Sequence, residues 1–139
     1  MGVEIESAGL AAERASRAQL KAIGVALEQI ERAAESGRAA VDEDLAFHRA
    51  IAEGTGNPEF ARFLQFIGGH LIPRRTVSGL TERMGGERAY LALIQEEHRR
   101  ISQAIESSDP KAAREAMRRH LTRSLERYRK LAAEQKKAA

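Results

Sequence analysis

Apolar residues recur every three or four positions along most of this chain, and that spacing predicts helices. One such stripe consists of Leu20, Ile23, Leu27 and Ile30. Runs rich in Val, Ile, Thr and Tyr, which strands prefer, are absent, whereas Ala, Glu, Arg and Leu are abundant. The sequence therefore predicts an all-α fold in which amphipathic helices bury their apolar stripes in an antiparallel bundle.

Local start and stop signals divide the chain into about six helices. Ser16 precedes Gln19 by three residues, the spacing of a capping box, and Asn57-Pro58 and Asp109-Pro110 are further helix starts. Gly68-Gly69 and Pro73 should bend or break the fourth helix. We expect helices at about 4–15, 16–36, 40–53, 58–72, 87–107 and from 110 onward.

Size and composition limit the class of protein. A chain of 139 residues forms one domain with a single core, and without cysteine it has neither a disulfide framework nor a thiolate metal site. The first residues, MGVEIESAGL, lack the features of a signal peptide, and the apolar stretches are too short to span a membrane. We therefore expect a cytoplasmic protein without a membrane partner.

The last predicted helix is basic. From Lys111 onward there are ten Lys or Arg residues and three Glu residues. Such a helix could contact nucleic acid or acidic lipid. The interpretation we favour is a solvated face with cations near a helix C-terminus, because no aromatic platform or base-reading motif accompanies the charge.

Four titratable residues stand on predicted apolar stripes, where such groups are normally avoided. They are Asp44, His48, His98 and His120. Asp44 and His48 are four residues apart on one helix, so their side chains can converge on a single ion. The other two histidines belong to the fifth and last predicted helices. Burying such groups unpaired costs several kcal/mol, and a metal ion between helices is a common partner.

The pattern alone leaves a second interpretation open for these four residues. Each histidine could be a core residue with its hydrogen bonds satisfied, and the Asp44–His48 pair could be a surface hydrogen bond. If they do bind a metal, three imidazoles and one carboxylate suit Zn, Ni, Cu or Fe, with bonds of roughly 2.0–2.2 Å to zinc. A metal with more than four positions would keep some open for water or a ligand carboxylate.

A second group of candidates lies near the expected irregularity of the fourth helix. An inward-pointing Arg74 or Arg75 could clamp a carboxylate in fork geometry, although both could equally be surface residues. His70 could line a cavity, and we expect it to have a role other than metal binding. These three residues are our candidates for binding a small ligand.

Common catalytic motifs are missing from the sequence. There is no nucleophile elbow, no phosphate-binding GxxxxGK[ST] loop, no HExxH and no Glu-x-x-His, and no carboxylate is clearly placed as a general base. A small helical metallohydrolase or isomerase using the same Asp and His residues remains the alternative function. A bundle in which the metal is purely structural is a third possibility.

Three segments together resemble the FCD domain, the effector-binding C-terminal domain of GntR-type bacterial transcription regulators of the FadR branch. They are ESAGLAAERAS, DLAFHRAIAEGTGNPEF and EEHRRISQAIESSDPKAAREAMRRHL. The resemblance implies a helical bundle that encloses a metal and a small-molecule pocket, with Asp44, His48, His98 and His120 as ligands of a divalent metal, Zn or Ni. It also implies a small organic acid as effector, its carboxylate meeting the metal and a nearby arginine.

The resemblance further implies a regulatory function and not an enzymatic one. Regulators of this type bind operator DNA through an N-terminal winged helix-turn-helix, which we expect to be absent from residues 1–139. We therefore expect an effector-sensing domain that forms a homodimer and reaches DNA only through that other domain.

Overall fold

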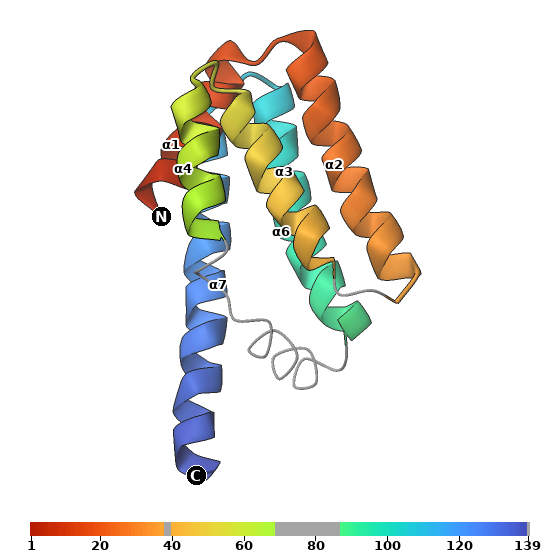
Figure 1. Ribbon diagram of the computed structural model, residues 1–139, viewed down its shortest axis with the longest axis vertical. Helices are drawn as coiled ribbons and strands as arrows, with labels where there is room; N and C mark the ends of the chain where they lie inside the picture. Colours follow the sequence, from red (N-terminus) through yellow and green to blue (C-terminus); the bar gives the residue numbers. More distant parts are fainter. Residues whose placement is uncertain (38–39, 69–86, 139) are drawn as a thin grey trace.

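The computed structural model describes residues 1–37, 40–68 and 87–138, and its regular elements are all α-helices (Figure 1). They are α1 (Gly2–Arg14), α2 (Arg17–Glu35), α3 (Val41–Glu53), α4 (Pro58–Gly68), α6 (Glu87–Glu106) and α7 (Pro110–Ala138). The predicted all-α fold is confirmed, and the described residues contain six helices.

The three helix starts with a predicted capping residue, those of α2, α4 and α7, are held by side-chain hydrogen bonds. Ser16 and Gln19 form a reciprocal capping box at the start of α2, with bonds of 3.1 and 2.9 Å. Asn57 accepts a hydrogen bond from the Glu59 amide, and Asp109 accepts one from the Ala112 amide, each at 3.0 Å. These bonds satisfy amides of the first turn, which have no partner within the helix.

The helices run alternately up and down (Figure 1), and the sequence neighbours α2 and α3, α3 and α4, and α6 and α7 pack antiparallel. Helix α7 packs against α1 and α6, α2 packs against α3 and α6, and α1 and α4 both contact α3. The largest fully buried apolar side chains are Ile23, Ile30, Phe47, Ile51, Ile101, Ile105 and Met117. Helices α3, α6 and α7 thus meet around one core, and that core also holds the polar residues described next.

None of the described helices combines the length and the apolar character that crossing a lipid bilayer demands.

Candidate metal centre

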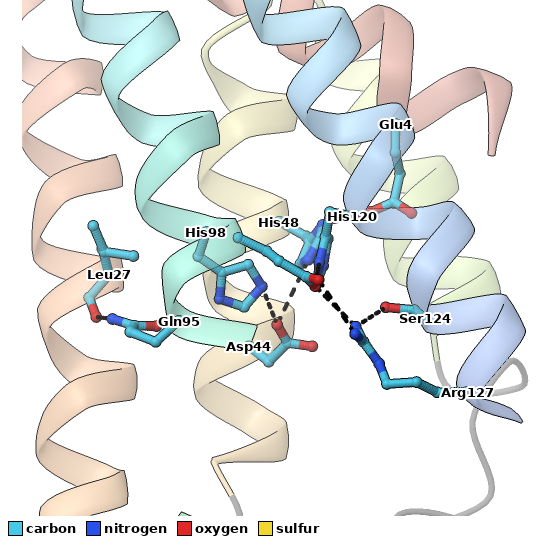
Figure 2. Close-up of polar contacts among 10 residues, drawn as sticks. Glu4, Leu27, Asp44, His48, Gln95, His98, His120, Ser124 and Arg127 are labelled. Atoms are coloured by element: carbon cyan, nitrogen blue, oxygen red, sulfur yellow. Dashed lines mark hydrogen bonds and ion pairs between the residues drawn. The ribbon is translucent and has the colours of Figure 1, made fainter. Parts of the chain in front are cut away.

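Helices α3, α6 and α7 each direct one histidine to the same point in the core (Figure 2). The ring centroids of His48 and His98 are 5.5 Å apart, those of His48 and His120 5.4 Å, and those of His98 and His120 4.7 Å. One ring nitrogen from each histidine lies within 4.8 Å of the other two. His98 is completely buried and the other two nearly so. The sequence therefore places three imidazoles where one ion could contact all of them.

Asp44 lies at the edge of this cluster, one helical turn before His48 on α3. Its Oδ1 atom is 3.0 Å from His98 Nε2 and 3.6 Å from His48 Nε2. The Asp44 side chain is 38% exposed. The four residues that the sequence predicted as a group are thus brought together, three in the core and Asp44 at its solvent side (Figure 2).

The buried carboxylate of Glu97 contacts the His120 ring at Nδ1. Glu97 Oε1 lies 2.8 Å from His120 Nδ1, and both side chains are almost fully buried. Arg127 donates to both oxygens of Glu97, at 2.8 and 3.2 Å, and to Ser124 Oγ at 3.1 Å. Because Arg127 keeps Glu97 ionised and the carboxylate can only accept, His120 donates from Nδ1, and Nε2 is the ring nitrogen that Glu97 does not engage.

A second carboxylate reaches His48 from the first helix. Glu4 Oε1 on α1 lies 2.7 Å from His48 Nδ1. The two atoms are close, but their angle falls outside good hydrogen-bond geometry. The contact is therefore mainly an electrostatic one, and it places α1 beside the histidine cluster.

The charges of the cluster shift several pKa values. Burial opposes ionisation of Asp44, but His48 and His98 outweigh it and hold the pKa of that carboxyl well below its usual value. Burial also disfavours the His48 cation, yet Asp44 and Glu4 raise its pKa to about 10. For His98, burial dominates and lowers the pKa to about 4 despite Asp44. His98 is therefore a neutral imidazole at neutral pH, the form that ligates metals.

The pKa of Glu97 is lowered as well, for a different reason. Burial would raise it, but the hydrogen bonds from His120 and Arg127 lower it to about 2. The carboxylate is therefore charged throughout the pH range in which proteins fold.

The residues present fit a divalent metal ion. Asp44 Oδ1 and both ring nitrogens of His98 are buried without a hydrogen bond of good geometry. Leaving such atoms unsatisfied is unfavourable by about 1–3 kcal/mol each, and a cation would satisfy those that face the cluster. The donor set, imidazole nitrogens with one carboxylate oxygen, is one that zinc, nickel, copper and iron accept.

The other predicted site residues lie outside the described part of the chain. These are His70, Arg74 and Arg75.

Sequence reasoning missed Glu97, Arg127 and Glu4. Glu97 had a usable signal, because it lies three residues after Ile94 and therefore on the same stripe of α6. Glu4 likewise precedes the buried Ala8 by four residues on α1. Arg127 carries the same signal, because it precedes the buried Leu131 by four residues and follows His120 by seven on α7.

Known proteins similar to this chain are transcription regulators. The profile of the FCD domain matches residues 1–123. The HTH-type transcriptional regulator LutR of Bacillus subtilis (strain 168) is 29% identical over 124 residues, which are 86% of this chain and 54% of LutR. The solved structure of Streptococcus agalactiae GntR matches with a TM-score of 0.68 and 25% identity, over 87% of this chain and 51% of that one. This chain thus spans about half the length of both relatives.

Proposed function

Since the chain belongs to the FCD domain family, whose members are domains of GntR-family transcription regulators and not enzymes, we propose that it senses a small organic acid through a bound divalent metal ion. The observation that carries this proposal is the convergence of three buried imidazoles and the Asp44 carboxylate. The proposed ligands are Asp44, His48, His98 and His120, and zinc or nickel is the proposed ion.

The proposed mechanism follows from which helices supply the ligands. When bound, the ion supplies a Lewis-acidic position that accepts a carboxylate oxygen of the effector. His48, His98 and His120 come from three different helices, so an acid held there contacts α3, α6 and α7 together. An effector with unequal affinity for two arrangements of these helices shifts the population between them, and that shift is the signal.

The whole regulator is part of the proposal, since the relatives are about twice as long as this chain. Residues 1–139 form one FCD-type ligand-binding domain. In the intact regulator, this domain pairs with a second copy, and an N-terminal winged helix-turn-helix outside these residues binds operator DNA. The name of the relative LutR supports a DNA-binding partner domain of the helix-turn-helix type.

Metal and acid binding can be tested together on chelator-treated protein. Zinc or nickel should bind with a stoichiometry of one, and a panel of sugar acids, hydroxy acids and dicarboxylates should raise the melting temperature only of the metal-loaded protein. The matched control is His98→Ala, which should retain neither metal nor acid. Acid binding that is equal with and without metal would contradict the proposal. A large metal shift with no response to any acid would indicate a purely structural ion.

The arginine that meets the acid is a separate part of the proposal. Arg74, with Arg75 and His70 beside it, is the candidate from sequence. Arg119 is the matched control, because it lines a groove of about 410 Å³ between α6 and α7 that also exposes Arg100 and Arg123. Arg74→Gln should weaken acid binding measured by calorimetry and leave metal content unchanged. Loss of binding in Arg119→Gln instead would move the acid to the α6–α7 groove.

A further inference from the structure

Glu97 is a buried charge that the proposed ligand set does not use. Its side chain is 4% exposed, and a carboxylate at such a depth is unfavourable unless donors and cations surround it. Those partners are present on α7: His120 donates from Nδ1, and Arg127 binds both carboxylate oxygens. Glu97 is thus fixed on one side by a guanidinium and on the other by a ring of the histidine cluster.

The position of the hydrogen bond decides which nitrogen of His120 is free. An imidazole that donates from Nδ1 keeps its lone pair on Nε2, and only a lone pair binds a metal. Ser124 accepts from the same Arg127 nitrogen at 3.1 Å, so the guanidinium is itself held in place. The order Ser124, Arg127, Glu97, His120 is therefore a continuous chain of contacts that ends at the cluster.

Glu4 contacts the Nδ1 atom of His48, as Glu97 contacts the Nδ1 atom of His120. Its carboxylate lies 2.7 Å from His48 Nδ1, whereas His48 Nε2 faces Asp44. Two of the three histidines thus meet a carboxylate at Nδ1 from outside the cluster. One of these carboxylates comes from α6 and the other from α1.

We propose that Glu97 and Glu4 are positioning residues of the metal centre: Glu97 holds His120 by a hydrogen bond at Nδ1, and Glu4 holds His48 by an electrostatic contact at Nδ1, so that Nε2 of each ring is the metal ligand. The inference rests on the metal site proposed above. A carboxylate behind a ligating imidazole also raises the basicity of the ligand nitrogen and fixes the ring orientation. Through Glu4, the first helix becomes part of a centre whose ligands come from three other helices.

The first measurement is zinc affinity, obtained by competition with a chromophoric chelator. Glu97→Gln and Glu4→Gln should each bind zinc about 10–100-fold more weakly than the wild type. Two neighbouring exposed carboxylates are the matched controls, Glu96→Gln on α6 and Glu6→Gln on α1, and their zinc affinity should equal that of the wild type. Glu4→Gln also keeps the inference testable if Glu97→Gln fails to fold, because the structure pairs Glu4 with no arginine within its described residues.

The second measurement detects ring protonation, which a merely structural role would not alter. Two-bond ¹H–¹⁵N spectra of zinc-loaded wild type should show His48 and His120 protonated at Nδ1, and in metal-free protein at pH 8 His120 should still be protonated there. In Glu97→Gln the Nδ1 proton of His120 should move upfield, since its acceptor has lost its charge.

The possible results distinguish failure of the roles proposed for Glu97 and Glu4 from failure of the metal site itself. Wild type that binds zinc while both Gln variants bind it equally well overturns the inference and leaves the metal site standing. A His120 ring that lacks the Nδ1 proton in the metal-free protein overturns the role of Glu97. Wild type that binds no zinc overturns the metal site itself, and the first titration reveals this before any variant is compared.

Discussion

At the scale of single residues, the cluster contains charges of both signs in a small buried volume. Asp44 and Glu97 are carboxylates with lowered pKa values, whereas His98 is a neutral imidazole with a pKa of about 4. The difference arises because Glu97 has cationic partners in contact, and for His98 burial outweighs Asp44. Each group therefore has a preferred protonation state, and pH acts on the fold through these preferences.

Acid should destabilise the metal-free protein through Glu97. Its pKa is about 2 in the folded protein, against 4.5 for an ordinary glutamate, so the unfolded chain takes up a proton first as pH falls. The stabilisation, at most about 3 kcal/mol, is present above pH 4.5 and is lost as pH falls toward 2. The groups that face Glu97 are His120, Arg123 and Arg127.

Urea unfolding with chelator present, repeated from pH 6 to pH 3, measures this loss. The free energy of unfolding of Glu97→Gln should fall less steeply with acid than that of the wild type. Asp44 and Glu4 titrate in both proteins and therefore cancel in the difference. Parallel curves for the two proteins would show that Glu97 is not ionised and paired as described.

At the scale of helices, the sequence predicted the starts well because local bonds set them. Ser16, Asn57 and Asp109 each cap a helix within three residues of their own position, so no long-range information is needed.

The buried face of α3 was harder to predict. The spacing of Leu45 from His48 and Ala52 predicts that Leu45 faces the core, but it is 39% exposed, whereas Phe47 is fully buried. Helix α3 contacts three helices, α1, α2 and α4. A single apolar stripe predicts burial against one neighbour only, so it does not identify every buried residue of such a helix.

For the site as well, residues set by local spacing could be predicted, and contacts between distant helices could not. Spacing along single helices was enough to predict that Asp44 and three histidines share the core side of the bundle. The pairing of Glu97 with Arg127 crosses from α6 to α7, and it depends on the relative height of two helices, which no repeat in the sequence encodes. The pattern therefore predicted the residues that face inward but not those that hold them.

Glycine-to-alanine substitutions should have opposite effects on two helices. A methyl group on Gly24 of α2 meets no atom within 4 Å, so Gly24→Ala should stabilise the protein by about 0.5–1 kcal/mol through helix propensity. On α1, the side chain of Arg114 from α7 lies over Gly9, and a methyl there would come within 2.7 Å of its Cγ. Gly9→Ala should therefore destabilise the protein, since it displaces Arg114 from its hydrogen bonds with Glu6.

Chemical unfolding of the two variants and the wild type measures the change in the free energy of unfolding, which should be positive for Gly24→Ala and negative for Gly9→Ala. Arg114→Ala provides the control for Gly9→Ala, because removal of the long side chain removes the obstruction. The methyl group should then be tolerated in the double variant. A Gly9→Ala protein as stable as Gly24→Ala would show that α1 and α7 are not packed this closely.

At the scale of the whole molecule, the candidate centre joins some helices and leaves others out. Its proposed ligands come from α3, α6 and α7, and Glu4 adds α1, whereas α2 and the described α4 contribute no side chain to it. Helix α2 is instead attached by packing against α3 and α6, by Gln95, which donates to the Leu27 carbonyl at 2.9 Å, and by the ion pair between Glu31 and Arg99. A bound ion would therefore stabilise the bundle unevenly.

Hydrogen exchange should reveal this asymmetry. An ion that binds only the folded protein raises the free energy of unfolding by about 2.7 kcal/mol when its free concentration is one hundred times its dissociation constant. Zinc should slow amide exchange most in the middle of α3, α6 and α7 and in the first turns of α1, and least in α2, where local opening breaks no metal bond. His98→Ala should abolish the zinc effect in all helices. Equal protection of α2 and α3 would mean that the bundle opens only as one unit, so that acid binding at the centre could not move the ligand-bearing helices separately from α2.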